Sequence, residues 1–375
     1  MSDLEVRPDA WLAEILGQPA AMVRAGTSLV ALVDRLSDLG VARRPGRPIV
    51  LTGMGSSAAA CGAAATVLGS AGVLATTIET AELLHFRLPA LAASGTLVIV
   101  SQSGAGAELV GLLDALDSSP TRPLVVGITN GDANPLARRA DLSFDTATGE
   151  EVGPSSGTFA GSLVMLAGVV RVLAGRPEVD APVIAAEVGA LSVAASRALG
   201  TVLATAAGPV DALDSALAGR AYVVFLGRGT ARAAADVGAL TLKEAAAFGC
   251  EALDPAAFRH GPLELAGPRL GAVIVALDQA TAPLDIALGA QLAAAGGGVA
   301  LIGAHPGLAG DMAPELAGEA AASAGVNFIW IPAVDPLLAP ALALAPIQLL
   351  AHRFAVRAGR SPGVLVHATK VTTRE

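Results

Sequence analysis

Two serines, a glutamine and a glycine directly follow an apolar run in the first third of the chain. Leu97 to Val100 is uniformly apolar and Ser101-Gln102-Ser103-Gly104 comes next, which predicts a buried strand ending in a polar loop. Helix-forming residues then extend from Ala105 to Leu116. The start of a helix has free backbone N–H groups and favours an anion, so this loop could bind a phosphate. An ordinary strand-to-helix turn capped by serine would have the same pattern.

A second short loop of similar composition lies closer to the N-terminus. The apolar residues Ile49 to Thr52 precede Gly53-Met54-Gly55-Ser56-Ser57, and an alanine-rich helix is predicted from Ala58 to Leu68. This loop lacks the third glycine of a dinucleotide fingerprint and the Gly-Lys-Ser/Thr of a Walker loop. Its two serines should face the same end of the sheet as the first loop. The two loops together favour a phosphate site.

Both loops belong to a repeated alternation of strands and helices, which predicts an α/β fold of flavodoxin-like three-layer sandwiches with parallel sheets. In the first half, five segments have strand patterns: Ile49–Thr52, Val73–Ile78, Leu97–Val100, Leu124–Ile128 and Leu142–Asp145. In the second half, four do: Tyr222–Leu226, Val273–Leu277, Val299–Ile302 and Phe328–Ile331. The loop Gly227-Arg228-Gly229-Thr230 repeats the first glycine loop. Ala276-Leu277-Asp278-Gln279 lacks the paired serines, so we expect one phosphate site per chain.

The pattern divides the chain into five parts. We predict N-terminal helices over 1–44, a first α/β domain over 45–175, a linker helix over 176–206, a second α/β domain over 207–350, and a C-terminal tail over 351–375. Because proline cannot donate a backbone hydrogen bond, Pro19 is expected to divide the N-terminal helical region into two helices.

Composition argues against several classes of protein. The net charge of −9 among 375 residues provides no basic face for a nucleic acid. We find no apolar run of membrane-spanning length, and the acidic N-terminus is unlike a secretory signal. The two cysteines, Cys61 and Cys250, make neither a zinc set nor a disulfide framework. We therefore expect a cytoplasmic protein without a metal, a cofactor, a nucleic-acid partner or a membrane partner.

A larger set of motifs, in a consistent order, resembles the sugar isomerase (SIS) domain family. The resemblance is closest to the tandem-SIS isomerase half of glucosamine-6-phosphate synthase and to the related amino-sugar-phosphate deaminases. The motifs are Glu14-Ile15, Gln18-Pro19, Gly55-Ser56-Ser57, Ser101-Gln102-Ser103-Gly104, Thr129-Asn130, Pro135-Leu136-Ala137, Phe225-Leu226-Gly227-Arg228-Gly229, Gly238-Ala239-Leu240, Leu242-Lys243-Glu244, Arg259-His260-Gly261-Pro262-Leu263, Pro346-Ile347-Gln348-Leu349-Leu350 and Lys370-Val371-Thr372.

This resemblance implies a phosphorylated hexose or hexosamine as ligand and proton transfer between its C1 and C2. It makes Glu244 the counterpart of the catalytic base, His260 of the residue that opens the sugar ring, and Lys370 of the lysine at the carbonyl end. It also implies a homodimer that shares its active site, with the segment around His260 supplied by the partner. The residues it assigns to the phosphate are Ser56, Ser57, Ser101, Gln102 and Ser103.

Each catalytic candidate has an alternative interpretation. Glu244 could be a helix-surface carboxylate, His260 a turn residue before Gly-Pro, and Lys370 a solvated residue near the end of the chain. The chain also departs from the family pattern. Ala105-Gly106 stands where the family usually has Glu-Thr, Thr241 stands where the synthase-like pattern has lysine, and the loop from Glu151 to Phe159 lacks the family's lysine. These departures affect the expected substrate more than the fold.

The reaction expected from these features is deamination coupled to aldose–ketose isomerisation. A 2-amino-2-deoxy-hexose 6-phosphate would become a ketose 6-phosphate and ammonia. The chain has no room for a glutaminase domain beside two SIS halves, which disfavours the synthase reaction. A fructosamine-phosphate deglycase and a non-catalytic phosphosugar-sensing module are the alternatives.

Overall fold

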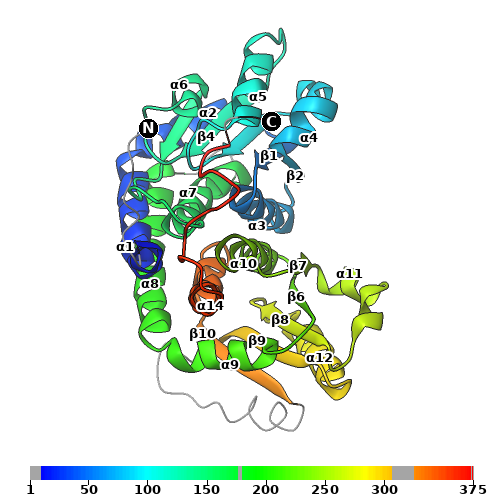
Figure 1. The fold of residues 1–375 in the computed structure, drawn as a ribbon. Coiled ribbons are helices and arrows are strands. Elements are labelled where there is room, and N and C mark those ends of the chain that lie inside the picture. The colour runs from blue at the N-terminus through cyan, green and yellow to red at the C-terminus, as the bar shows by residue number, and fades with distance from the viewer. Residues whose placement is uncertain (1–9, 176–179, 306–324, 373, 375) are drawn as a thin grey trace. The chain divides into compact units, whose positions relative to one another are not determined.

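The computed structural model describes residues 10–175, 180–305, 325–372 and 374. The chain divides into two compact units, each assembled from separate segments (Figure 1). The serine-loop unit contains Gly17–Glu151, Ser155–Ser196 and Val366–Glu375, and the arginine-loop unit contains Met1–Leu16, Val152–Pro154 and Arg197–Leu365. The predicted boundaries assumed continuous segments and stay predictions. Residues 1–9, 176–179, 373 and 375 of the predicted helices, linker and tail lie outside the described part.

The sheet of the serine-loop unit is parallel and has the strand order β2-β1-β3-β4-β5. Its strands are β1 (Ile49–Gly53), β2 (Ala75–Glu79), β3 (Thr96–Val100), β4 (Leu124–Thr129) and β5 (Leu142–Asp145). β1 and β3 are buried along their whole length, which explains their continuous apolar sequences. This order is the flavodoxin-like one, so the five strands predicted for the first half are confirmed apart from shifts at their ends.

Helices cover both faces of this sheet (Figure 1). Leucines at helical spacing on α5 pack against alternate residues of β3, including Leu97 and Ile99. α3 packs on α7 and on β1, so it covers the other face. The helices of this unit, in chain order, are α2 (Val33–Ala42), α3 (Ser56–Ser70), the short α4 (Thr80–Glu82), η1 (Leu83–Arg87) and η2 (Leu88–Ala93), α5 (Ala107–Asp117), α6 (Pro135–Arg139) and α7 (Gly157–Ala174).

The sheet of the arginine-loop unit has the order β10-β9-β8-β6-β7, which repeats the first order when read from the other edge. Its strands are β6 (Tyr222–Gly227), β7 (Cys250–Leu253), β8 (Leu270–Ala276), β9 (Gly298–His305) and β10 (Val326–Pro332). β7 was not predicted from the sequence. Its four residues lie at the sheet edge and are only partly buried, so they lack a strand-like apolar pattern.

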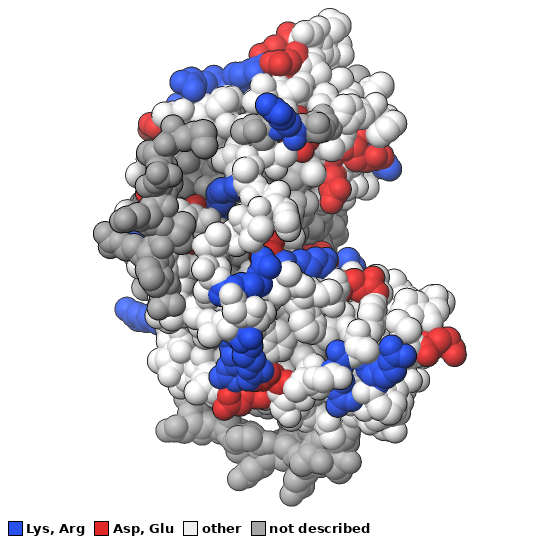
Figure 2. All heavy atoms as spheres, viewed as in Figure 1, with Lys and Arg blue, Asp and Glu red and all other residues white. Residues whose placement is uncertain are grey.

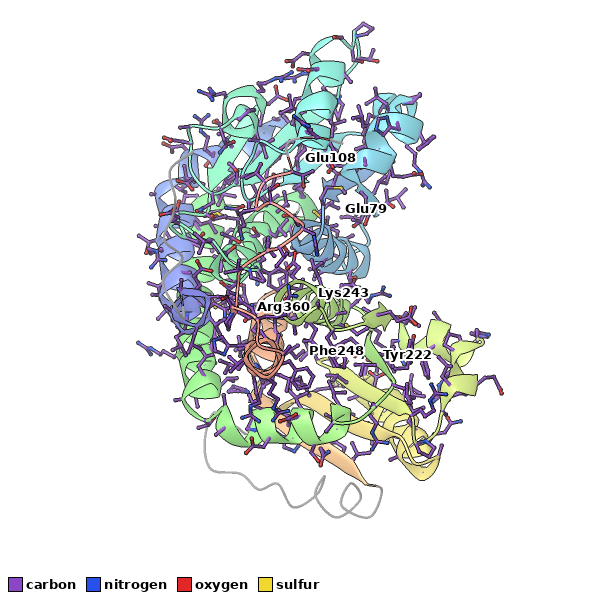
Figure 3. The ribbon with its side chains drawn as sticks, in the orientation of Figure 1. Glu79, Glu108, Tyr222, Lys243, Phe248 and Arg360 are labelled. Carbon is purple, nitrogen blue, oxygen red and sulfur yellow. The ribbon has the colours of Figure 1, made fainter. Side chains whose placement is uncertain are left out.

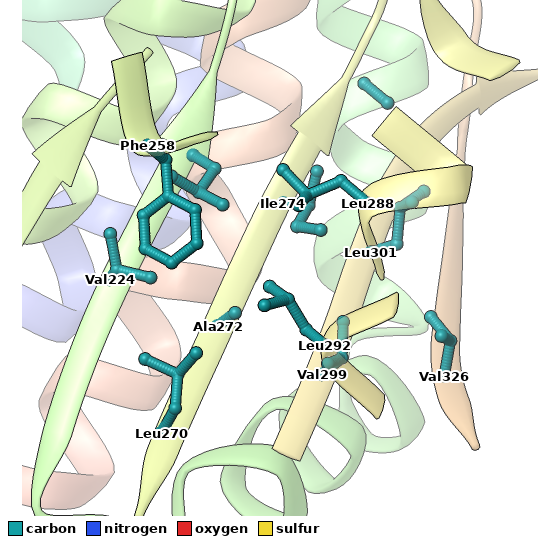
Figure 4. Close-up of a cluster of buried hydrophobic side chains, with 12 residues drawn as sticks. Val224, Phe258, Leu270, Ala272, Ile274, Leu288, Leu292, Val299, Leu301 and Val326 are labelled. Carbon is teal, nitrogen blue, oxygen red and sulfur yellow. The ribbon is translucent and has the colours of Figure 1, made fainter. Parts of the chain in front are cut away.

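The core of this unit forms between β8 and the helices that cover it. Ile274 and Leu270 of β8 pack with Leu288 and Leu292 of α12 and with Phe258 of α11 (Figure 4). α10 and α14 pack together where Gly238 closely approaches Ile347. The helices are α9 (Ala207–Leu217), α10 (Ala231–Ala246), α11 (Pro255–Arg259), η3 (Pro262–Leu265), α12 (Ala282–Ala294) and α14 (Ala339–Arg357).

The expected break at Pro19 is wrong, because α1 (Ala10–Ala31) continues through this residue. Proline removes one backbone hydrogen bond from the helix, but Ile15 and Met22 on either side of it are fully buried and hold the helix in place. The carbonyl of Pro19 accepts a hydrogen bond of 2.8 Å from Ser196 Oγ on α8 (Ala181–Ala204). The interruption falls instead at Leu32, after which α2 begins.

The prediction that no apolar run has membrane-spanning length is also wrong. Among the described residues, α7, α8 and α14 are long and apolar enough to do so by length and composition alone. Within the most apolar 18-residue window of each helix, 83% of α7, 78% of α14 and 39% of α8 is buried inside the protein. A helix that packs on all sides in a core is apolar all round, so α7 and α14 have the composition of buried helices.

Candidate functional site

The loop after β3 is held in a tight turn that only glycine can complete. Gly104 has φ +60°, and a Cβ there would lie 1.9 Å from Asn134 Oδ1. The backbone N–H of Gly104 donates to the hydroxyl of Ser101 at 3.2 Å, and that of Ala105 donates to the hydroxyl of Ser103 at 3.3 Å. Both serine hydroxyls therefore help to shape the loop.

The loop after β1 has a similarly constrained backbone. A Cβ on Gly53 would lie 2.9 Å from the backbone carbon of Ser57, so the strand end and the start of α3 are in close contact. Gly55 has φ +54° and is the residue before the first turn of α3. This geometry presents Ser56 and Ser57 at the N-terminus of a 15-residue helix, where an anion is favoured.

A small hollow joins the two loops to the start of α7. Its wall includes three of the predicted phosphate ligands, and Ser101 and Ser103 are not part of this lining. The lining residues are Ser56, Ser57, Gln102, Ser155, Thr158, Phe159 and Ser162. Five serine or threonine hydroxyls and the side-chain amide of Gln102 therefore line the hollow and can form hydrogen bonds with a polar ligand. Two of these hydroxyls, on Ser56 and Ser57, lie in the first turn of α3. Ser155, Thr158 and Ser162 were not predicted from the sequence, although the first two lie in a segment that resembles a family loop.

The C-terminal tail is bound to this same unit at two points. The carbonyl of Thr372 accepts a hydrogen bond of 3.0 Å from the backbone N–H of Ala107, the first residue of α5 after the β3 loop. Lys370 Nζ lies 2.8 Å from Glu151 Oε2. The lysine side chain is 27% exposed. It is therefore not the fully solvated residue of the alternative interpretation.

Glu151 is a buried carboxylate, with 3% of its side chain exposed. Its Oε1 accepts hydrogen bonds from the backbone N–H groups of Ser156 and Thr158 at 2.9 and 3.1 Å and from the Ser156 hydroxyl at 3.0 Å. Its Oε2 accepts the hydroxyl proton of Thr158 at 2.6 Å. These donors stand at the N-terminus of α7, where the helix dipole also favours a negative charge. Glu151 was not predicted as a site residue from the sequence.

Glu244 and His260 belong to the arginine-loop unit. Glu244 is partly buried in the last turn of α10, next to Lys243, whose position is labelled in Figure 3. His260 is exposed at the end of α11, before Gly261, which has φ +132°. Their assignment to catalysis stays a prediction. The structure groups Ser56, Ser57 and Gln102 around one hollow, and it describes Glu244 and His260 only within their own unit.

The loop after β6 repeats the β1 loop but carries a buried ion pair. Gly229 has φ +59°, and a Cβ on Gly227 would lie 2.6 Å from the carbonyl oxygen of Ala231. Arg228 Nε and Nη2 lie 2.9 and 2.8 Å from Asp285 Oδ1. Asp285 is fully buried, and burial raises the pKa of its carboxyl, an effect that the hydrogen bond from Arg228 partly offsets.

Charge elsewhere is dispersed. On the face shown in Figure 2, most of the surface is uncharged, and Lys and Arg side chains and Asp and Glu side chains lie in small scattered groups. Within the described ranges, no three His, Cys, Asp or Glu side chains are grouped so as to hold a metal ion. Burial raises the pKa of the Cys250 thiol to about 11, and Cys61 is fully buried with its pKa raised further, so neither is an activated nucleophile.

The two parallel, doubly wound sheets define an α/β class of protein, and comparisons with known proteins agree with this class. Residues 44–170, a segment that includes both serine loops, match the SIS domain. The chain is similar, over about three quarters of its length, to isomerizing glutamine–fructose-6-phosphate aminotransferases. The isomerizing aminotransferase of Caulobacter vibrioides is 30% identical over 288 residues, which make up 75% of this chain and 45% of that protein. The chain thus spans less than half the length of this relative.

Solved structures share the fold over almost the whole chain. The C-terminal domain of glucosamine-fructose-6-phosphate aminotransferase from Francisella tularensis has a TM-score of 0.75 at 21% identity, with 97% of this chain and 100% of that domain covered. Glucosamine-6-phosphate deaminase from Thermotoga maritima has a TM-score of 0.67 at 17% identity, with 97% and 99% covered. The predicted resemblance to SIS proteins and the predicted α/β class with parallel sheets are therefore confirmed.

Proposed function

We propose that this chain is a phosphosugar enzyme that converts a 2-amino-2-deoxy-hexose 6-phosphate and water into a ketose 6-phosphate and ammonia. The observation that carries the proposal is the position of Lys370. The tail holds this amine at Glu151. Glu151 Oε2 also accepts a hydrogen bond from the hydroxyl of Thr158, which lines the serine-lined hollow. A binding module needs only the phosphate ligands, whereas a cation fixed beside them suits stabilisation of developing negative charge.

The scarcity of lysine strengthens this argument. The sequence contains 24 Lys and Arg residues, and only Lys243 and Lys370 are lysines. A chain that uses arginine almost everywhere retains a primary amine at position 370 and another directly before Glu244. Arginine would form the ion pair with Glu151 at least as well, but it does not give up its proton or react with a carbonyl. The amine at 370 therefore fits chemistry better than it fits structure alone.

The proposed steps use the residues assigned by resemblance. His260 protonates the ring oxygen and opens the sugar, and Glu244 removes the proton from C2 and returns it to C1. The C2 amine becomes an imine, which water hydrolyses to release ammonia and leave the ketose. Lys370 stabilises the negative charge that develops on O1. Ser56, Ser57, Ser101, Gln102 and Ser103 hold the phosphate, the first two and Gln102 from the wall of the hollow.

Two wider features belong to the same proposal. The repeated strand order of the two sheets supports two tandem SIS domains in one chain. The exposure of His260 on a short segment between α11 and η3 is compatible with its insertion into the active site of a second copy, so we propose a homodimer with shared sites. A sedimentation measurement that finds only monomer at assay concentration would contradict this arrangement.

Ammonia release tests the reaction. We expect turnover with glucosamine 6-phosphate or galactosamine 6-phosphate, and a loss of kcat on the order of 10³-fold in Glu244→Gln with phosphosugar binding retained. Glu264→Gln, an exposed carboxylate of the same unit, should leave kcat unchanged. Release of an amine from fructosamine phosphates instead would show a deglycase. Binding of the whole panel without any turnover would leave a sensing module.

A further inference from the structure

The structure contains one carboxylate beside the serine-lined hollow that the proposed steps do not use. Glu151 accepts four hydrogen bonds from the start of α7 and pairs with Lys370. Burying an ionised carboxylate is costly unless its charge is balanced by hydrogen bonds and a cation. Four donors already satisfy it as a helix-end acceptor. The added cation therefore suggests a purpose beyond stabilising α7.

We propose that Glu151 is a positioning residue that fixes the ammonium group of Lys370 at the edge of the serine-lined hollow. This inference rests on the proposed function, since it names how one of its groups is held. The four residues before Lys370, from Val366 to Thr369, are exposed. A lysine on such a tail would otherwise sample many rotamers, and holding it in one geometry is what an ion pair to a rigid partner achieves.

The partner is rigid because both of its oxygens are fixed. Oε1 is held by two backbone N–H groups of α7, and Oε2 is shared by Thr158 Oγ1 at 2.6 Å and Lys370 Nζ at 2.8 Å. Thr158 itself lines the hollow. One oxygen thus links the wall of the hollow to the amine, and the second tail contact, from Thr372 to Ala107, fixes the chain on the other side of Lys370.

A structural cap and a positioning residue make different predictions for kinetics. Glu151→Gln keeps an oxygen that can accept from the backbone of α7 but removes the charge that holds the amine. We expect kcat to fall on the order of 10²-fold with little change in KM, the size of effect that a misplaced catalytic group causes. In a Lys370→Met background the same change should cause no further loss. Glu150→Gln, at the exposed neighbouring carboxylate, is the control and should leave kcat unchanged.

Conservative changes sharpen the distinction. Lys370→Arg preserves a cation for Glu151 but replaces the compact ammonium with a larger planar guanidinium, so this variant should remain as stable as the parent while kcat falls because the charge no longer lies at O1. If Glu151→Gln instead raised KM and left kcat unchanged, Glu151 would act on the ligand. If the double variant lost the product of the two single losses in kcat, Glu151 would act on the fold or on the ligand rather than through the lysine. Either result would overturn the proposal.

A measurement without substrate separates this proposal from the proposed function. An amine-acylating reagent can modify only Lys243, Lys370 and the N-terminus, so mass spectrometry can follow each site. Relative to Lys243, Lys370 should react about tenfold faster in Glu151→Gln than in the parent, a factor equivalent to 1.4 kcal/mol. An unchanged ratio would refute the positioning role. A raised ratio in a protein that turns over no sugar phosphate would keep the positioning role and refute the enzyme.

Discussion

The loops after β1 and β6 share a backbone and differ in the chemistry they carry. In both, a first glycine packs closely against the following helix and a second glycine has a positive φ, +54° at Gly55 and +59° at Gly229. The β1 loop then presents Ser56 and Ser57 to a hollow. The β6 loop presents Arg228, which lies against the fully buried Asp285 at the start of α12. One loop offers hydroxyls to a ligand, and the other satisfies its own charge internally.

This difference shows how little of the fold has to change between the two units. Both sheets have the same strand order, and both glycine loops lie at the carboxyl end of a central strand, where a doubly wound fold binds its ligand. In the arginine-loop unit, Arg228 stands where the β1 loop has Met54, and Thr230 and Ala231 stand where it has Ser56 and Ser57. The fold provides a position at which a ligand can bind, and a few side chains determine whether it binds there.

Removing the arginine tests the internal role of the β6 loop and has the largest expected effect. Arg228→Met leaves the carboxylate of Asp285 buried without its cation, while Oδ2 already has no hydrogen-bond partner among the described residues. We expect the free energy of unfolding to fall by about 3–5 kcal/mol at neutral pH, measured by urea denaturation. Phosphosugar affinity should not change.

The pH dependence of this variant follows from the sign of the Asp285 shift. Burial raises the pKa of Asp285 above its unfolded value, so protonation of this carboxyl favours the folded state. Without Arg228 that preference is larger. The loss of unfolding free energy in Arg228→Met, relative to the parent, should therefore be larger above the pKa of Asp285 and should become smaller as the pH falls through it. Arg232→Met breaks a partly exposed pair with Asp236 and a 3.3 Å hydrogen bond to the carbonyl of Ala252, and it should cost about 1 kcal/mol. Equal losses in the two variants would contradict the difference between the loops.

A matched pair of glycine substitutions tests whether the β1 loop alone binds a ligand. Gly55→Ala and Gly229→Ala each place a side chain at positive φ, so each should lower the unfolding free energy by about 1–3 kcal/mol. Only Gly55→Ala moves serines that line the hollow. Its affinity for a hexosamine phosphate, measured by calorimetry, should fall about tenfold, a change of 1.4 kcal/mol. A similar loss in Gly229→Ala would place a ligand in the arginine-loop unit as well.

The elements of both sheets follow from sequence because their causes are local. Buried parallel strands such as β3 are continuous apolar runs, and positive-φ turns require glycine, so strand, loop and helix could be predicted together. β7 and Pro19 were misjudged because their outcome depends on tertiary packing. β7 pairs at the edge of its sheet and is only partly buried, and α1 remains intact because Ile15 and Met22, on either side of Pro19, are buried.

The site was predictable only in part, for a similar reason. Ser56, Ser57 and Gln102 follow strands directly, so the sheet itself brings them to one edge. Glu151 and Lys370 are 219 positions apart, and no local pattern predicts their ion pair. In the sequence, the loop from Glu151 to Phe159 differs from the family pattern by lacking a lysine. The structure shows instead that its carboxylate binds a lysine from the tail.

The smallest expected effect concerns Gly106, where the family usually has threonine. Gly106 is the N-cap of α5 with φ −61° and ψ 150°, a conformation that any residue adopts. A Cβ there would meet only Glu108 Oε2 at 3.6 Å and the carbonyl oxygen of Thr372 at 4.0 Å, both ordinary contacts. Gly106→Thr should therefore fold normally, and it should gain a few tenths of a kcal/mol because threonine is at least as good an N-cap as glycine.

The same substitution returns a hydroxyl to the loop that follows Ser103. If the β3 loop binds the phosphate, the added hydroxyl should tighten hexosamine-phosphate binding by about 0.5–1.5 kcal/mol, the net value of one hydrogen bond. Gly106→Val has nearly the same shape without the hydroxyl and serves as the control. Equal affinities of the threonine and valine variants would mean that position 106 does not face the phosphate. The ligand would then be held from the β1 loop and the start of α7 alone.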